Sequence, residues 1–319
     1  MVKGDAVKLL QSEEVVENLE GKVDLIITSP PFPLNNKKKY GNKIGEDYRN
    51  WFIGLAPVFS KLLSEKGSLV IEIGNSWEPE RPVQSLLHLE CLLGLVNHPT
   101  SELRLIQEFI CYNPSKLPSP AQWVTVNRLR TVDSYTHVWW IAKSDFPKAD
   151  NSKVLRPYSK SMKKLLEKQE YNSGKRPSEH VISGDGFLKD HGGSISHNFF
   201  ELESLDEKRD VRLPHNVLSY SNTNSNDYFL KKCREKNITP HPARMNKGLI
   251  EFFIEFLTDK GDLVLDPFGG SNTTGYCAEL SSRKWISFEI DDSYIKQSKI
   301  RFQDPKISPP KKVHRNDSK

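Results

Sequence analysis

Apolar runs with the length of a β-strand recur along the first part of the chain. They occupy residues 23–28, 68–73, 105–112 and 136–142. An amphipathic stretch at 48–63 has the spacing of a helix that covers one face of a sheet. Apolar strands that alternate with such helices are typical of a parallel sheet buried on both faces. The pattern therefore predicts an α/β fold, with one half of its core in residues 1–143.

The pattern changes twice in the rest of the chain. Residues 144–240 are rich in Ser, Asn, Lys, Gly and His and contain few apolar runs, which indicates an inserted polar lobe. Helix and strand signals then return, at 247–258, 262–266, 284–290 and 292–302. We expect the second half of the core in 241–302. The charged, proline-containing segment 303–319 is predicted to be a disordered tail.

Composition narrows the class of protein. The 319 residues exceed the usual size of one compact unit, which fits a core with a second lobe. A hydrophobic content of 36%, a mean hydropathy of −0.58 and the lack of any apolar run of about 18 residues predict a soluble cytoplasmic protein without a membrane partner. The four cysteines are far apart without a C-x-x-C pair, so we expect reduced, structural thiols and no metal site.

The charge balance is compatible with a polyanionic partner. The chain carries 46 basic and 41 acidic residues, a net charge of +5, which alone is only a modest argument for nucleic acid. The distribution says more, because basic residues gather in two places. They are Lys37, Lys38 and Lys39 in one segment, and Lys160, Lys163, Lys164 and Lys168 in the other.

A glycine-rich turn at 266–275 follows an apolar strand and precedes a helix. This arrangement brings the backbone close to a ligand at the carboxyl end of the strand. A second strand ends on Glu289, 23 residues after Asp266, where its carboxylate can accept both hydroxyls of a ribose. Gly270 and Gly275 have the spacing of a phosphate-binding loop, but Tyr276 stands where that loop needs lysine. The pattern favours an adenosine cofactor without phosphates. A tight strand-to-helix connection without a ligand would show the same glycines and is the alternative interpretation.

The strand at 23–28 runs directly into Ser29, Pro30, Pro31 and Phe32. Proline cannot donate to a sheet and holds the preceding residue extended, so the Ser29 hydroxyl and the Pro30 carbonyl become rigid acceptors at a strand end. Such a pair can accept the two N–H groups of an exocyclic base amine, and Phe32 offers a face for the base. A simple strand terminator is the alternative interpretation.

These motifs together resemble those of the beta-class amino-methyltransferases of type II restriction-modification systems. The likeness rests on Ser-Pro-Pro-Phe, on the turn after Asp266 and on Phe288-Glu289, in an order with the catalytic motif first and the cofactor turn last. The stretches 113–120, 138–140 and 191–194 are similar to a cytosine-N4 member that modifies CAGCTG. The resemblance implies a Rossmann-like, S-adenosylmethionine-dependent methyltransferase fold with a permuted, mostly parallel seven-stranded sheet. It makes 1–143 the catalytic half, 144–240 the target-recognition region and 241–302 the cofactor half.

The resemblance also implies the roles of individual residues. The catalytic motif would be Ser29, Pro30, Pro31 and Phe32. The cofactor site would comprise Asp5, His241, Asp266, Pro267, Phe268, Gly269, Gly270, Ser271, Thr273 and Glu289. Lys37, Lys38 and Lys39 would contact double-stranded DNA, and Tyr112 would be either a wall of the base pocket or a core residue. After His241 to Arg244 the chain continues with Met245 and Asn246, where the family often has Phe-Pro. A cognate restriction endonuclease would be the functional partner.

Several functions remain open at this level. Adenine N6 presents the same kind of amine as cytosine N4, and either base would have to leave the duplex to reach the site. Methylation of a protein amide and a non-catalytic DNA-binding module are further alternatives. Cytosine C5 methylation would need a nucleophilic cysteine, usually after proline, whereas Glu90, Ile110, Lys232 and Tyr276 precede the four cysteines.

Overall fold

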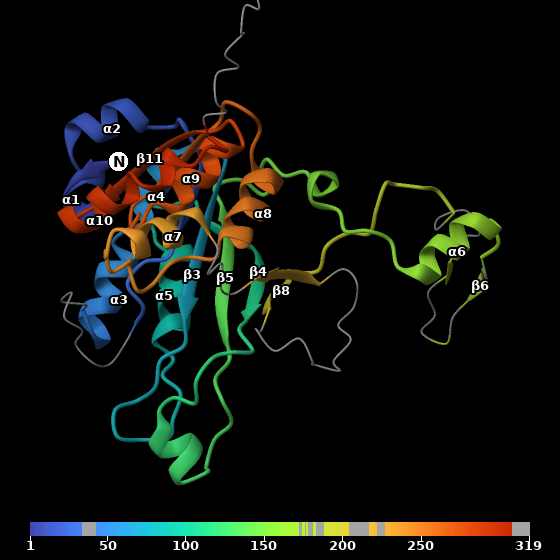
Figure 1. The fold of residues 1–319 in the computed structure, drawn as a ribbon, viewed down its shortest axis with the longest axis horizontal. Coiled ribbons are helices and arrows are strands. Elements are labelled where there is room, and N and C mark those ends of the chain that lie inside the picture. Colours follow the sequence, from blue (N-terminus) through green and yellow to red (C-terminus); the bar gives the residue numbers. More distant parts are fainter. Residues whose placement is uncertain are drawn as a thin grey trace, which may run out of the picture.

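A nine-stranded sheet forms the centre of the part of the chain that the structure describes (Figure 1). This computed structural model describes residues 1–33, 43–171, 174–175, 177, 181–182, 188–203, 217–221 and 227–307. The strand order is β1-β11-β10-β2-β3-β5-β4-β8-β9. The strands are β1 (Val2–Lys3), β2 (Val23–Thr28), β3 (Leu63–Gly74), β4 (Arg104–Tyr112), β5 (Tyr135–Ala142), β8 (Phe199–Glu203), β9 (Leu218–Ser221), β10 (Leu263–Asp266) and β11 (Lys284–Glu289). A separate two-stranded sheet joins β6 (Gly174–Lys175) to β7 (Val181–Ile182).

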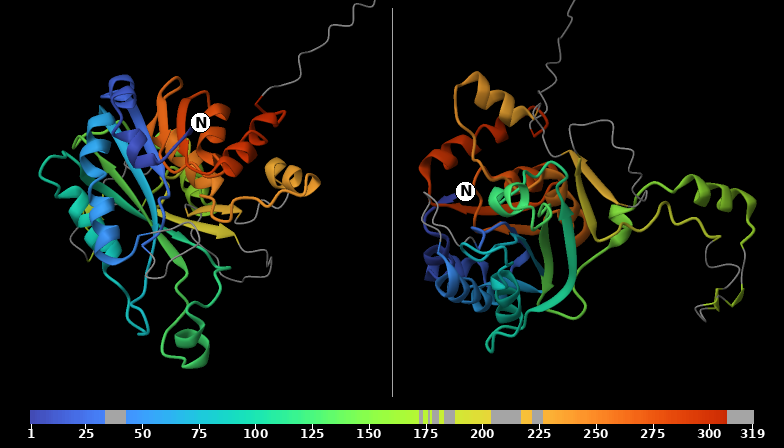
Figure 2. Two further views of the ribbon diagram at one scale, coloured as in Figure 1. Left: turned by 90° about the vertical axis from the view of Figure 1, so that its left-hand side faces the viewer. Right: turned by 90° about the horizontal axis from the view of Figure 1, so that it is seen from below.

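Helices cover both faces of this sheet (Figure 2). The helices of the described residues are α1 (Ala6–Leu10), α2 (Glu13–Leu19), α3 (Gly45–Ile53), α4 (Ala56–Leu62), α5 (Leu87–Val96), α6 (Lys160–Lys168), α7 (Tyr228–Glu235), α8 (Lys247–Leu257), α9 (Thr273–Leu280) and α10 (Asp292–Ser298). Short helical turns occupy Gln122–Val126, Asn151–Val154 and Arg301–Gln303. None of the described helices is long and apolar enough to cross a membrane.

The continuous apolar character of the central strands follows from burial on both faces. Along β2, Ile26 packs into a core cluster with residues of α1 to α5, while Leu25 and Ile27 pack into a second cluster with α8 and α9. Successive side chains of a strand point to opposite faces, so both sets of positions must be apolar. The strands β1, β11, β10, β2 and β3 are parallel, and β5 is antiparallel to both β3 and β4.

The predicted elements agree with the structure in the core and differ at two places. The amphipathic stretch 48–63 divides into α3 and α4. The sheet has two strands more than the seven expected. These are β8 and β9, which come from the polar region 144–240 and run parallel to β4. Gly248 of α8 packs against Tyr220 of β9 so closely that a Cβ atom would lie 2.0 Å from the ring. The region 144–240 therefore contributes two strands to the main sheet, while α6 and β6 stand away from it (Figure 1).

The chain remains packed against the core beyond residue 302. Asp304 is buried and accepts a hydrogen bond of 2.7 Å from the hydroxyl of Tyr276. Residues 303–307 therefore belong to the folded core rather than to the expected tail. The remainder of that tail, 308–319, lies outside the described residues.

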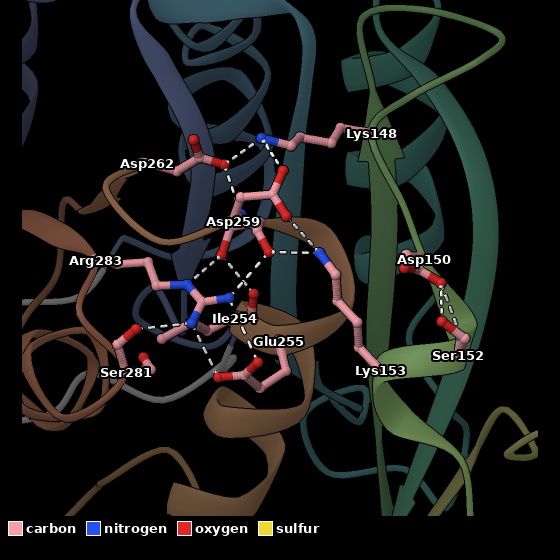
Figure 3. Close-up of polar contacts among 11 residues, drawn as sticks. Lys148, Asp150, Ser152, Lys153, Ile254, Glu255, Asp259, Asp262, Ser281 and Arg283 are labelled. Atoms are coloured by element: carbon pink, nitrogen blue, oxygen red, sulfur yellow. Dashed lines mark hydrogen bonds and ion pairs between the residues drawn. The ribbon is translucent and has the colours of Figure 1, made fainter. Parts of the chain in front are cut away.

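A polar cluster fastens the segment after β5 to α8 and β10 (Figure 3). Lys148 contacts Asp259 at 2.7 Å and Asp262 at 2.6 Å, and Lys153 contacts Asp259 at 2.6 Å. These salt bridges hold the pKa of Asp259 at about 2, because both ammonium groups donate to its carboxylate. The cluster lies at the amino end of β10, opposite the carboxyl ends of the parallel strands, so it has a structural role.

Arg283 anchors this cluster from within the protein. Its side chain is 4% exposed, and it donates to the Thr258 hydroxyl and carbonyl, both at 3.0 Å, and to Glu255 at 3.0 Å. Removal of the guanidinium would leave buried acceptors without donors. We expect Arg283→Met to lower the free energy of unfolding by about 2 kcal/mol in urea titrations.

The matched control is Arg81→Met. The Arg81 side chain is 65% exposed and pairs with Glu78 at 3.7 Å, so its removal should cost less than about 0.5 kcal/mol. Equal effects of the two substitutions would contradict the structural role of Arg283.

Candidate functional site

A buried carboxylate joins the two motifs that the sequence places at opposite ends of the chain. The Thr28 hydroxyl, at the end of β2, donates to Asp266 at the end of β10 over 2.8 Å. The same carboxylate accepts from the Thr274 hydroxyl at 2.6 Å and from the Phe268 amide at 3.1 Å. Burial raises the pKa of Asp266 to about 6, against the lowering effect of these hydrogen bonds. Asp266 therefore fixes the glycine turn beside the catalytic motif, and its carboxylate is already engaged within the protein.

The backbone of the turn faces Glu289. The Gly270 amide donates to one carboxylate oxygen of Glu289 at 2.9 Å, and the Asp291 amide donates to the other at 2.8 Å. Each oxygen keeps a lone pair for a further donor. Gly270 has φ +51°, and a Cβ atom there would meet the His241 ring at 3.5 Å. Glycine thus satisfies a left-handed backbone, and His241 packs in ordinary contact distance over this residue.

The other expected cofactor residues surround this turn. Arg301 is buried and holds Ser271 through its carbonyl at 2.8 Å and its hydroxyl at 3.0 Å. Phe268 packs edge-on against Trp51, with ring centroids 5.8 Å apart. Pro267 and Thr273 are buried, and Gly269 is so close to Ser287 that its Cβ would lie at 3.0 Å.

Asp5 follows the strand beside Glu289. The Gly4 amide donates to the Glu289 carbonyl at 2.9 Å, and the exposed Asp5 carboxylate caps α1 through the Lys8 amide at 3.0 Å. The structure thus brings Asp5 to the strand end that carries Glu289. Its contact with the adenine stays a prediction.

The catalytic motif is held rigidly at the end of β2. Pro30 is buried, and the Pro31 carbonyl accepts a hydrogen bond of 2.6 Å from the Tyr48 hydroxyl. Phe32 lies flat on the end of β3, where a Cβ atom on Gly74 would come within 2.5 Å of its ring. Tyr48 and Gly74 therefore fix the backbone and the ring of the motif.

Glu72 is a site residue that the sequence interpretation missed. Its carboxyl group accepts a hydrogen bond from the Thr136 hydroxyl at 3.2 Å, and the Ser29 side chain lies close by. The surrounding protein raises the pKa of Glu72 to about 7 by desolvation, although Thr136 and Ser29 both favour the ionised form. The signal was available, since Glu72 is the one charged residue within the apolar run 68–73.

A large pocket extends from this carboxylate toward the cofactor turn. Its volume is about 1110 Å³, enough for a small ligand and a base together. The residues at its two ends are Phe32, Glu72, Gly74, Tyr135 and Thr136 at one, and Thr273, Arg301, Arg244, Met245 and Asn246 at the other. Among the described residues no group of three His, Cys, Asp or Glu side chains is placed to hold a metal ion.

Of the expected substrate contacts, the structure describes Tyr112 alone. Tyr112 is not among the residues that line this pocket, and its ring lies 6.2 Å from Phe199 of the added strand β8. Tyr135, its partner across β5, lines the pocket instead. Lys37, Lys38 and Lys39 fall outside the described residues.

A second polar network supports the loop after β3. Asn75 accepts from His137 at 2.9 Å and donates to Asp133 at 2.9 Å, while the other ring nitrogen of His137 contacts Glu108 at 2.5 Å. Asn75 and Asp133 both line the pocket. The network was also missed, although a histidine within the apolar strand 136–142 was a visible signal.

Comparison with known proteins gives the family. The family described as DNA methylase matches residues 23–300. The chain belongs to this family. It is 41% identical to the type II methyltransferase M.PvuII of Proteus hauseri over 310 residues, which cover 97% of this chain and 84% of that protein.

Solved structures agree with this assignment. The PvuII DNA methyltransferase (cytosine-N4-specific) superposes with a TM-score of 0.69 at 35% identity, covering 95% of this chain and 86% of that one. The M1.HpyAVI–SAM complex superposes with a TM-score of 0.51 at 17% identity, over 94% of this chain and 97% of that one, and shows the shared fold. The predicted Rossmann-like methyltransferase fold is thus confirmed.

The contact between Phe32 and Gly74 gives a test of the site geometry. In Gly74→Ala the new methyl group must displace the Phe32 ring, because 2.5 Å is far inside van der Waals contact. We expect kcat for methyl transfer to fall about 10-fold or more, with cofactor affinity within about 2-fold, since the predicted role of the ring is to contact the base.

A double-mutant cycle checks the mechanism of this loss. In a Phe32→Leu background the Gly74→Ala substitution should cost less, because the smaller side chain leaves room for the methyl group. Additive losses would show that Gly74 acts by another route.

Proposed function

We propose that this protein is a site-specific DNA methyltransferase that transfers the methyl group of S-adenosylmethionine to cytosine N4 in double-stranded DNA. One observation carries the proposal. The Glu72 carboxyl group, which has the Ser29 side chain close by, lines together with Phe32 a pocket of about 1110 Å³ that also includes Thr273 of the glycine turn. Such a site can bind an exocyclic amine through acceptors and remove its proton.

The residues around the turn fit S-adenosylmethionine. The cofactor has a ribose diol but no phosphate, and the turn offers the Glu289 carboxylate as acceptor without a phosphate-binding lysine. Gly269 and Gly270 leave the space that side chains would fill, and His241 stands over Gly270. Asp5, Pro267, Phe268, Ser271 and Thr273 would complete the site around the adenosine and the methionine chain.

The chemistry assigned to the chain is positioning followed by proton removal. S-adenosylmethionine would supply an electrophilic methyl group. The Ser29 hydroxyl and the Pro30 carbonyl accept the two N–H groups, which favours the pyramidal nitrogen needed for attack, and Phe32 stacks on the base. Transfer of this methyl group would leave the amine nitrogen cationic. Ser29 takes its proton and passes its own to ionised Glu72.

The state of the cysteines disfavours cytosine C5 chemistry. Cys111 lines the pocket, and burial raises its pKa to about 12, so its thiol stays protonated near neutral pH. A covalent attack on C6 of cytosine would need a thiolate. The acceptor pair of Ser29 and Glu72 is instead suited to an amine.

The choice of cytosine over adenine rests on similarity. M.PvuII aligns over nearly the whole chain, and its solved counterpart is described as cytosine-N4-specific. Adenine N6 is the second candidate, because the same acceptors serve either amine. We propose 144–240 as the target-recognition region, with α6 contributing the basic residues Lys160, Lys163, Lys164 and Lys168. The protein would act in the prokaryotic cytoplasm beside a restriction endonuclease that cuts the unmodified site.

Nucleoside analysis tests this function directly. Bacterial genomic DNA without N4-methylcytosine is incubated with the protein and methyl-labelled S-adenosylmethionine, then digested for mass spectrometry. We expect labelled N4-methylcytosine, and sequencing that detects modified bases should place it at one short motif. Labelled N6-methyladenine alone would make adenine the target, and DNA retention without label would indicate a binding module.

The raised pKa of Glu72 predicts a pH profile. Because the ionised form accepts the proton, the rate of methyl transfer should rise with pH, reach half of its maximum at about 7 and level off at higher pH. Glu72→Gln should abolish this step and lower kcat about 100-fold. Single-turnover rates measured from pH 5.5 to about 9 would show it.

Stability gives an independent check on the same residue. Its folded pKa of about 7 lies above the ordinary 4.5, so ionisation opposes folding and stability falls as pH rises between these values. Glu72→Gln should remove this part of the pH dependence. An unchanged pH profile of the methyl-transfer rate in Glu72→Gln would refute the proton path.

Ser29→Ala should lower kcat while cofactor binding by calorimetry stays within about 2-fold.

A further inference from the structure

The loop between β4 and β5, residues 113–134, carries exposed apolar side chains beside the pocket. Leu117 is 80% exposed, Val126 is 71% exposed and Leu129 is 64% exposed. Figure 1 shows this loop, with its single helical turn, extending below the end of the sheet. Large apolar side chains on a monomer surface are unfavourable in water, and several in one loop mark an interaction site.

The loop is built as a fixed wall rather than as a loose connection. Its base is closed by the Asn113 amide, which donates to the Ser134 carbonyl at 2.7 Å. The amides of Leu129 and Arg130 both donate to the Trp123 carbonyl, at 2.9 and 3.2 Å. The Arg130 guanidinium stacks on the Trp77 ring, which belongs to the loop after β3. The backbone around the exposed side chains is thus held in place.

The inner side of the same loop lines the pocket. Lys116, Ser119, Pro120, Gln122 and Trp123 are among the lining residues. Leu117, Val126 and Leu129 do not line the pocket themselves, but they belong to the loop that forms its wall, next to the space that receives the flipped base under the proposed function. The exposed part of the loop would therefore adjoin the DNA at the point where the base leaves the duplex.

The charge of the loop indicates a polyanionic partner. Residues 113–134 contain three cations, Lys116, Arg128 and Arg130, and one acid, Asp133. Arg128 is exposed, and Lys116 lies 3.8 Å from Asp133 at the edge of the pocket. The neighbouring loop after β3 adds Glu78 and Glu80 together with Arg81, which pairs with Glu78. Cations that flank apolar side chains suit phosphates on either side of stacked bases.

We propose that the 113–134 loop is a wedge that inserts Leu117, Val126 and Leu129 into the base stack of duplex DNA next to the target base. The inserted side chains fill the space left by the extruded base and so stabilise the open duplex. Apolar wedges of this kind offset the loss of base stacking. The inference rests on the proposed function and assigns the step before chemistry to a surface outside the acceptor site.

The test compares two DNA substrates with one variant. The triple variant Leu117→Ala, Val126→Ala, Leu129→Ala is assayed on a matched duplex and on the same duplex with the target base mispaired. A mispaired base costs less to extrude, so it needs the wedge less. We expect kcat/KM to fall about 10-fold or more on the matched duplex and less than about 2-fold on the mispaired one.

Phe146→Ala is the matched control. Phe146 is 83% exposed, but it lies after β5, at the opposite end of the sheet from the pocket. It should leave both substrates unaffected. Calorimetric binding of S-adenosylmethionine to the triple variant should also be unchanged.

Three outcomes would overturn the wedge. Full activity of the triple variant on the matched duplex would remove its basis, and equal losses on both duplexes would assign the loop to the shape of the pocket. A smaller molecular mass of the variant by light scattering, with equal losses on both substrates, would mean that a second copy of the chain covers these side chains. Inactivity of the wild-type protein on either duplex would instead refute the proposed function.

Discussion

The buried carboxylate of Asp266 is the interaction on which the site depends. It accepts hydroxyl protons from Thr28 and Thr274 and an amide proton from Phe268, so the ends of β2 and β10 and the start of α9 share one anchor. Burial of this carboxylate is unfavourable, as its raised pKa shows, and three donors compensate for it. The glycine turn and the Ser-Pro-Pro-Phe segment, more than 230 residues apart in sequence, are positioned against each other through this group.

A second carboxylate defines what the site can do. Glu72 keeps a pKa of about 7 because desolvation outweighs the opposite effects of Ser29 and Thr136. A group poised near neutral pH can accept a proton and release it again, which a fully ionised surface glutamate does poorly. The two carboxylates thus differ in role, since Asp266 fixes the frame and Glu72 faces the pocket. Tyr48 and Gly74 then hold the prolines and the aromatic ring that complete the acceptor site.

The surfaces around the pocket divide the remaining tasks. The 113–134 loop forms one wall of the pocket and also carries exposed apolar side chains. The strands β8 and β9 extend the sheet beyond β4. The region 144–240 therefore contributes two strands to the sheet and also carries the basic helix α6. Gly248 allows this arrangement, because only the absence of a Cβ atom lets Tyr220 lie against α8.

The sequence by itself determined the α/β class, the boundaries of β2 and β10, the glycine turn and the Ser-Pro-Pro-Phe motif. These depend on local patterns, namely apolar runs, prolines that end strands and glycines at positive φ. Only the tertiary structure showed that Glu72 faces Ser29, that Tyr135 rather than Tyr112 lines the pocket, and that β8 and β9 join the sheet. These depend on contacts between distant segments. Whether a strand residue faces a pocket or a neighbouring strand is decided by register and by what packs beside it, which no local pattern records.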